Sequence, residues 1–247
     1  MKTYKRVLLF GASGRTGQLL VKQLLDLDIE VNAVARRENW ISTSLLNNPK
    51  FNIHIVNVSK LTDKEYQSLI KGMDYVLFTL GHNLSFKGVW GEPRKLVSGV
   101  VSRTINAINE TLPHSAVKLV LMASTGCMNE FNNEQPPISQ KVMIAIIRKL
   151  IPPQKDNELA VNLLSASSTE NDLIDWVILR PDTLVNKEYV TYYTLCESPI
   201  RNAIFNPGKT SRINVANLMS RLVNEPDLWK AWCKKMPVIY NSELKDS

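Results

Sequence analysis

Cysteine is scarce in this sequence: the 247 residues contain only three, Cys127, Cys196 and Cys233, and no Cys-x-x-Cys pair occurs. Scattered cysteines argue against a disulfide-stabilised secreted protein and favour a reducing compartment, so we expect a cytoplasmic protein. The histidine, cysteine and aspartate residues also lack the spacing that is typical of a metal site. We therefore expect no metal cofactor.

Long apolar runs are missing as well. No run approaches the roughly 20 residues that span a bilayer, and Lys5 and Arg6 precede a short strand-like run rather than the apolar region of a signal peptide. An apolar segment at 138–151, bracketed by two Pro-Pro pairs, could pack in the core, line a pocket, form a dimer face or lie on a membrane surface. We favour core packing, which is compatible with a pocket wall, and expect no stable membrane association.

Internal repeats, low-complexity tracts and Gly/Ser linkers are absent, and the apolar content of 44% and charged content of 21% are ordinary for a globular protein. These features predict a single domain over residues 1–247, present as a monomer or a homodimer. The net charge of +7 is spread along the chain without a nucleic-acid-binding motif. We expect no nucleic acid partner, and a modest positive excess suits a polyanionic small molecule.

The sequence does contain a regular alternation of apolar runs and helical patterns. Strands are predicted near 5–10, 30–35, 52–57, 75–80, 117–123 and 176–180, and helices near 15–27, 63–71 and 95–112, the second of them after the N-cap candidate Thr62. This order predicts an α/β fold, a doubly wound parallel sheet of the Rossmann type. Later helices are predicted near 138–151, 156–168, 215–224 and 226–235, with a last strand at 237–240 and an irregular, aromatic-rich stretch at 185–207. We expect the small substrate-side region to come from about 126–170 and 183–212.

A glycine turn follows the first predicted strand, with the spacing Gly11-x-x-Gly14-x-x-Gly17 before a helical pattern. Gly11 permits the tight exit from the strand, Gly14 leaves room for a diphosphate to touch backbone N–H groups, and Gly17 lets the helix pack close to the sheet. Strand, glycine turn and helix in this order predict a nucleotide diphosphate site.

The end of the second predicted strand carries two arginines, Arg36 and Arg37, and no acidic residue. An acidic side chain there would accept hydrogen bonds from the adenosine ribose 2′-hydroxyl of NAD, whereas a basic one would pair with the 2′-phosphate of NADP. The planar guanidinium suits a phosphate, and Arg15 in the glycine turn could add a second contact. The sequence therefore predicts NADP(H) as the cofactor in preference to NAD(H).

Ligands of doubly wound sheets bind beyond the carboxyl ends of the strands, so we expect the segments that follow the strands to converge on one crevice. Ser124 and His82, which follow two of these strand ends, are the candidate catalytic residues. The candidate cofactor contacts are Gly11, Ser13, Gly14, Arg15, Thr16, Gly17, Arg36, Arg37, Asn57, Val58, Leu80, Gly81, Ser124 and Pro181.

The glycine turn with Arg15 inside it, at the start of the chain, resembles the short-chain dehydrogenase superfamily. Within it, the sequence is similar to the atypical NAD(P)H-binding branch that includes NmrA-like regulators and biliverdin or flavin reductase-like proteins. The supporting motifs are Leu80-Gly81, Ala123-Ser-Thr-Gly126, Trp176-x-x-x-Arg180-Pro181 and Ser211-Arg-Ile-Asn-Val-Ala216. In the last of these, Asn214 replaces the aspartate that is usual in the branch.

The Tyr-x-x-x-Lys pair that supplies the acid in most short-chain dehydrogenases occurs nowhere in this sequence. Its absence matches the atypical branch, where the tyrosine is commonly missing. Ser124 stands where the superfamily places its active-site serine, and His82 could contact phosphate or donate a proton. Asp156 resembles an acidic residue of the branch, but we interpret it as charge near the start of its own helix. Cys127 has no base partner in view, so we do not expect a nucleophile there.

The resemblance implies a reductase that transfers a hydride from NADPH to a small planar acceptor such as a flavin, a quinone or a tetrapyrrole. Such acceptors can take their proton from solvent, so positioning would supply most of the catalysis. Two alternatives stay open. The protein could sense NADP(H) without turnover, as NmrA-like regulators do, or, less consistently with the missing tyrosine, act as an epimerase or dehydratase.

Overall fold

A computed structural model describes residues 4–81, 95–132, 152–170 and 172–242, together with isolated positions between 134 and 146. Its centre is an eight-stranded sheet with the order β3-β2-β1-β4-β5-β6-β10-β8, in which only the β10–β8 pairing is antiparallel. The strands are β1 (Arg6–Phe10), β2 (Glu30–Ala35), β3 (Phe51–Ile55), β4 (Tyr75–Phe78), β5 (Val117–Met122), β6 (Ile174–Pro181), β8 (Tyr193–Cys196) and β10 (Val238–Asn241). The predicted α/β fold with a doubly wound sheet is confirmed.

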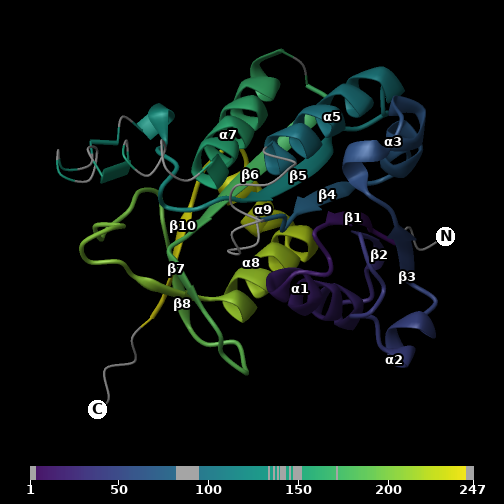
Figure 1. Cartoon of the computed structure of the whole chain (residues 1–247), viewed down its shortest axis with the longest axis horizontal. Helices are drawn as coiled ribbons and strands as arrows, with labels where there is room; N and C mark the ends of the chain where they lie inside the picture. Colours follow the sequence, from purple (N-terminus) through teal and green to yellow (C-terminus); the bar gives the residue numbers. More distant parts are fainter. Residues whose placement is uncertain are drawn as a thin grey trace.

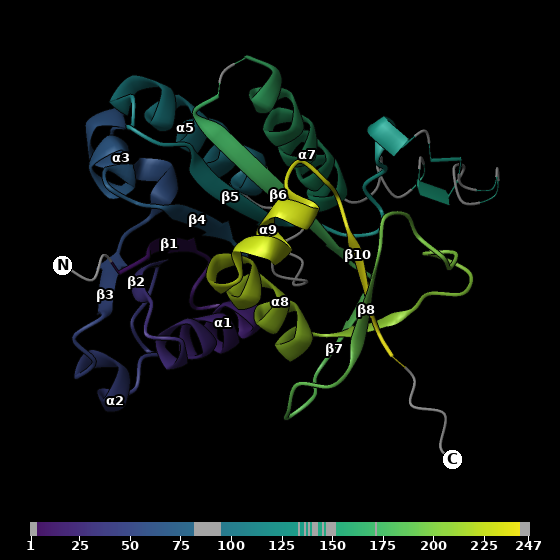
Figure 2. The same cartoon turned by 180° about the vertical axis from the view of Figure 1, so that it is seen from behind.

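Two layers of helices cover the sheet, one on each face (Figures 1 and 2). The helices α3 (Asp63–Ile70), α5 (Leu96–Thr111) and α7 (Pro152–Glu170) share one core cluster with one set of strand residues. The helices α1 (Arg15–Asp26), α8 (Arg212–Asn224) and α9 (Pro226–Trp232) share the other. Because successive strand residues point to opposite faces, β1 contributes Leu8 and Phe10 to the first cluster and Val7 and Leu9 to the second.

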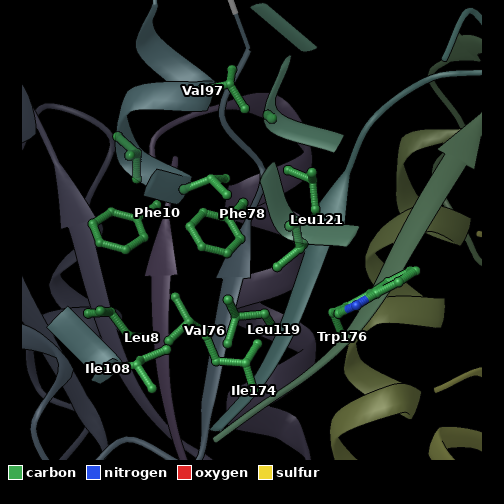
Figure 3. Close-up of a cluster of buried hydrophobic side chains, with 14 of the residues drawn as sticks. Leu8, Phe10, Val76, Phe78, Val97, Ile108, Leu119, Leu121, Ile174 and Trp176 are labelled. Atoms are coloured by element: carbon green, nitrogen blue, oxygen red, sulfur yellow. The ribbon is translucent and has the colours of Figure 1, made fainter. Parts of the chain in front are cut away.

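The first core cluster is centred on aromatic rings at the carboxyl ends of β1 and β4. Phe10 and Phe78 stack with their ring centroids 5.6 Å apart, and Leu121 of β5 continues this layer, while Trp176 of β6 lies one layer lower, level with Leu119 (Figure 3). These side chains are all essentially buried. The central strands are therefore covered on both faces, as their continuous apolar sequences predict.

The first half of the chain follows the prediction closely. Thr62 caps α3 in a capping box, since its hydroxyl accepts from the Glu65 N–H while the Glu65 carboxylate accepts from the Thr62 N–H. A short helix that was not predicted, α2 (Thr43–Leu46), and a 3₁₀ turn at Val58–Lys60 flank β3.

The second half contains three corrections. The helix predicted from 156 begins at Pro152, and both prolines lie in its first turn, where a missing N–H costs nothing. The stretch at 185–207 is not wholly irregular, because β8 pairs with β10 at the edge of the sheet. A second, two-stranded sheet joins β7 (Thr183–Val185) to β9 (Lys209–Ser211). Most of the helix predicted at 138–151 lies outside the described residues.

Among the described residues, no helix is both long and apolar enough to cross a membrane.

Candidate functional site

The chain reverses its direction of travel across the sheet at β1, which lies between β2 and β4. From β1 the chain builds outward to β2 and β3, then returns to place β4 on the other side. In open α/β sheets the carboxyl ends of the strands at such a switch point form the ligand crevice. Here those ends lead into the glycine turn after β1 and into Thr79 and Leu80 after β4.

Two glycines of the turn are required by the fold itself. Gly11 has a φ of +88°, and a Cβ there would lie 2.8 Å from the backbone nitrogen of Leu80. A Cβ on Gly17 would lie 2.2 Å from the carbonyl oxygen of Gly11, so α1 packs on the turn too closely for any side chain. These contacts fit the roles predicted for Gly11 and Gly17.

Gly14 differs from these two glycines. Its φ of −73° suits any residue, and its nearest Cβ contact is 3.2 Å, again to the carbonyl oxygen of Gly11. The residue is exposed, and its N–H donates to that same oxygen over 3.0 Å. The fold therefore requires glycine at this position much less than at positions 11 and 17. A side chain at position 14 would extend into the space above the turn.

The first turn of α1 is open to a ligand. Gly14 is its N-cap and brings no capping side chain, and no acidic residue lies in the first turn. The leading N–H groups of a helix have no intrahelical acceptor and carry the positive end of the dipole, so this turn suits an anion. Ser13 and Arg15 beside it are exposed, whereas Thr16 is buried.

Arg36 and Arg37 follow β2 as predicted, and both are exposed. Neither forms an ion pair with any residue in the described part of the chain. Two guanidinium groups are therefore available to a phosphate at the strand end that borders β1.

The residues predicted after β3 and β4 have structural partners. The Asn57 carboxamide oxygen accepts from the Ser59 N–H over 3.2 Å and caps the 3₁₀ turn, while the Val58 carbonyl accepts from Arg103. Leu80 and Gly81 follow β4 directly. His82, the second candidate catalytic residue, lies outside the described residues.

The loops after β5 and β6 form the opposite wall. The Ser124 hydroxyl is half-buried and accepts from the Gly126 N–H over 3.3 Å. The Thr125 N–H donates to the Pro181 carbonyl, which joins the two loops. Ser124 and Pro181 thus lie on adjoining strand ends, as the sequence predicted.

Asp182, which the sequence analysis did not single out, connects this wall to the chain before β9. Its carboxylate accepts from the N–H groups of Thr183 (2.8 Å) and Gly208 (2.9 Å). Burial raises the pKa of Asp182 above its usual range, although these hydrogen bonds and one from the Thr125 hydroxyl act in the other direction. Its place directly after the Arg180-Pro181 motif is the signal that could have found it.

Arg180 of the same motif has a structural role. Its side chain is fully buried, forms an ion pair with Glu134 over 2.8 Å, and donates to the carbonyls of Cys127, Glu197 and Met236. Burial raises the pKa of Glu134, but the hydrogen bonds from Arg180 and the Asn129 N–H outweigh it and leave the pKa below its usual range. Arg180 therefore ties the loop after β5, the chain after β8 and the chain before β10 to β6.

Asp156 requires a correction. It caps a neighbouring helix rather than its own, because its buried carboxylate accepts from the N–H groups of Val97 (2.7 Å) and Ser98 (3.1 Å) at the start of α5. The sequence-based interpretation placed the charge at the right kind of position but on the wrong helix, because α7 begins a turn earlier than expected.

Cys127 lies near the crevice, and burial raises the pKa of its thiol to about 11. At neutral pH the thiol is therefore protonated, the form that reacts poorly as a nucleophile. In the described residues, no group of three or more histidine, cysteine or acidic side chains is placed to bind a metal ion.

A cavity of about 450 Å³ lies beside α1, and its lining residue Gln18 donates to the Ser13 carbonyl of the glycine turn over 2.9 Å. Gln18, Lys22 and Asp26 of α1 line it on one side, and Trp40 and Ser42 on the other. It contains no residue from the loops after β4, β5 or β6, so we do not assign it to the crevice.

Solved structures of similar fold span nearly the whole chain. A Rossmann-fold NAD(P)-binding family protein from Shigella flexneri has a TM-score of 0.65 and 20% identity, covering 98% of each chain. A short-chain dehydrogenase/reductase from Veillonella parvula in complex with NADP has a TM-score of 0.66 and 15% identity, covering 97% of this chain and 95% of that one. ChuY, an anaerobilin reductase from Escherichia coli O157:H7, has a TM-score of 0.67 and 18% identity, covering 98% of this chain and 100% of that one.

At these identities the similarity establishes the fold. No curated protein matches the sequence. The family described as NAD(P)H-binding matches residues 11–226, from the glycine turn to the start of α9. The predicted resemblance is thereby confirmed, and the chain belongs to this family of NAD(P)H-binding proteins with a Rossmann fold.

Proposed function

We propose that this protein is an NADP(H)-dependent reductase that transfers a hydride to a small planar acceptor. The observation that carries the proposal is the open glycine turn at the switch point: Gly14 leaves a space that a side chain would fill, above an uncapped helix N-terminus. When bound there, NADPH supplies the hydride. The chain's own residues supply the binding, the orientation and the exclusion of water.

The preference for NADP(H) is supported by the end of β2. Arg36 and Arg37 are exposed, and no acidic residue stands at the strand end to bind a free ribose 2′-hydroxyl. A phosphate beside a guanidinium gains paired, charge-assisted hydrogen bonds. Arg36 is the principal candidate, with Arg37 beside it in the sequence.

The proposal needs no side-chain acid. The chain lacks a Tyr-x-x-x-Lys pair. A flavin, quinone or similar acceptor can take its proton from water, so the walls at Ser124 and Pro181–Thr183 would act by positioning. We place the acceptor between the substrate-side segments at about 126–170 and 183–212.

The missing pair also favours a second candidate, a sensor that binds NADP(H) and changes its contacts with a partner without turnover. The deciding experiment measures NADPH oxidation against a panel of flavins, quinones and aldehydes, with cofactor affinity from calorimetry. Reduction of one acceptor class with transfer of the label from deuterated NADPH supports the reductase. Tight NADPH binding with no acceptor reduced, together with an altered proteolysis pattern, supports the sensor.

The remaining expectations belong to the same proposal: a small-molecule substrate, a cytoplasmic location, a monomer or homodimer, and no nucleic acid partner. Three scattered cysteines and the absence of a nucleic-acid-binding motif support them.

A further inference from the structure

The helix α8 runs along the strands, from the end of the sheet where β1 finishes to the end where β1 begins. Lys5, just before β1, donates from its ammonium to the carbonyls of Val223 (2.9 Å) and Asn224 (3.1 Å) at the end of α8. The end of α8 therefore lies where β1 begins, and its first residue, Arg212, lies toward the edge where β1 ends. Both views show α8 beside α1, and Gln23 of α1 donates to the Ile213 carbonyl.

Arg212 is held in place by neutral acceptors. Its guanidinium donates to the Asn186 carboxamide oxygen over 2.9 Å and to the Leu184 carbonyl over 3.3 Å. Leu184 belongs to β7, which follows β6 and the Asp182 turn. These bonds fix the side chain beside the wall of the crevice without neutralising its charge.

The positive charge of Arg15 acts on Arg212. Partial burial lowers the pKa of Arg212 first, and the positive charge of Arg15 in the glycine turn lowers it further. The buried Arg180 and the half-exposed Arg221 each pair with a glutamate, whereas neither Arg15 nor Arg212 pairs with a carboxylate of the described residues. Arg15 and Arg212 are the first residues of the neighbouring helices α1 and α8. Two like-charged guanidinium groups so placed, without a counter-ion from the described residues, fit an anion between them.

We propose that Arg15 and Arg212 clamp the dinucleotide diphosphate from opposite sides, which makes Arg212 a cofactor-binding residue that the family motif alone does not identify. The inference rests on the proposed dinucleotide site. The sheet order favours the diphosphate over the 2′-phosphate, because β2 with Arg36 and β6 with its β7 extension lie on opposite sides of β1. The diphosphate joins the two halves of the cofactor, so it lies between these walls.

The test is the affinity for NADPH and for NADH, measured by calorimetry on the full chain. Losing a charge-assisted contact to a phosphate weakens binding by about 10- to 100-fold. Because both cofactors carry the diphosphate, Arg212→Ala should weaken both by the same factor, and Arg212→Lys should weaken both less. Arg36→Ala should weaken NADPH alone. Lys230→Ala is the control, since Lys230 is an exposed cation on α9, whose Trp229 packs on Tyr75 at the beginning of β4, the end of that strand away from the glycine turn.

Two further measurements separate binding from a structural role. Affinity for NADPH should fall less steeply with added salt in Arg212→Ala than in the wild type, because one charge contact is gone. Without cofactor, the unfolding temperature of Arg212→Ala should change little, because the variant loses the hydrogen bonds to Leu184 and Asn186 but also the repulsion with Arg15. A lower unfolding temperature together with an unchanged salt dependence would overturn the clamp in favour of a structural arginine.

Three other outcomes would each overturn the clamp, and the last of them would overturn the proposed function as well. A loss confined to NADPH would assign Arg212 to the 2′-phosphate and overturn the diphosphate clamp. Unchanged affinity of Arg212→Ala for both cofactors, with normal wild-type binding, would overturn the clamp and leave the proposed function intact. Failure of the wild type to bind either cofactor would overturn the proposed function itself, and the clamp with it.

Discussion

Gly14 separates cofactor binding from folding more sharply than any other residue of the turn. Valine at this position would place its Cβ 3.2 Å from the Gly11 carbonyl oxygen, which a small shift relieves, and its methyl groups would occupy the space above the turn. We expect Gly14→Val to abolish detectable NADPH binding in calorimetry while its circular dichroism spectrum stays that of the wild type.

The matched control is Gly17→Val, in which the Cβ would lie 2.2 Å from the same oxygen. That variant should fail to fold or unfold at a much lower temperature. Normal NADPH affinity in Gly14→Val would show that the turn is not the diphosphate site.

Arg36 should determine the choice between the two cofactors. An ion-paired phosphate contact contributes about 1.5–3 kcal/mol, so Arg36→Ala should lose about 10- to 100-fold in NADPH affinity and little in NADH affinity. Calorimetry with both cofactors measures the ratio, and Arg37→Ala is the neighbouring control. Equal affinity of the unmodified protein for NADPH and NADH would contradict the assignment.

Ser124 and His82 test whether the reaction needs a side-chain acid. Loss of a general acid slows a reaction by about 10²–10⁴-fold, and direct hydride transfer to a planar acceptor predicts a much smaller loss in Ser124→Ala and in His82→Ala. Steady-state rates with deuterated NADPH measure both the rate and the label transferred. If either substitution stops turnover while NADPH still binds, an acid–base mechanism operates instead.

At the scale of elements, the buried pair of Arg180 and Glu134 joins the loop after β5 to β6, and the same guanidinium contacts the chain after β8 and before β10. Removing one partner of a buried pair leaves an uncompensated charge and costs about 3–5 kcal/mol. We therefore expect Glu134→Gln to lower the free energy of unfolding by about that amount at pH 7, measured by urea denaturation.

The same pair predicts a pH dependence. The pKa of Glu134 is lowered in the folded protein, so its stabilisation is fully present above the unfolded value of about 4.3 and is lost as the pH falls through the folded value. Between about pH 5 and pH 3, the wild type should lose more stability than Glu134→Gln. Parallel curves for the two proteins would show that the pair contributes no pH-dependent stability.

Elements with local signals were predictable from the sequence. The β1–turn–α1–β2 unit is marked by an apolar run, a glycine spacing and an amphipathic pattern, and α3 by its capping box at Thr62. The strand β8 has only four residues, and it exists through its pairing with β10 about forty residues later. Nothing within β8 itself indicates that partner.

The residues of the candidate site also divide into those with a local signal in the sequence and those without one. Gly11, Gly14 and Arg36 stand at fixed offsets from predicted strands, so the roles predicted for them follow from spacing. Arg212 and Asp182 acquire theirs only when distant segments meet: Arg212 when α8 packs against α1, and Asp182 when the chain at Gly208 returns to the end of β6. Such contacts leave no periodicity that a sequence could show.

At the scale of the whole molecule, the crevice is built from both halves of the chain, with the glycine turn and β2 on one side and the loops after β5 and β6 on the other. A dinucleotide that bridges the two halves should stabilise the entire fold. At 100 times the dissociation constant the gain is about 2.7 kcal/mol, which for a chain of this size corresponds to a rise of about 5–10 °C in Tm.

Thermal unfolding with and without NADPH measures this rise. Gly14→Val should show no rise, because it folds but does not bind. An equal rise in that variant would mean that NADPH stabilises the protein from another site.

The three glycines of the turn also have a consequence for descent. Backbone crowding restricts Gly11 and Gly17, so a descendant that keeps this turn should keep both glycines, whatever its function. Gly14 is under much less crowding, and in the proposed function the bound dinucleotide is what requires glycine there. A lineage that abandons its dinucleotide and keeps the scaffold for another purpose can therefore change the middle glycine first, and a gene copy with the outer two intact and a bulky residue between them is the mark of that history.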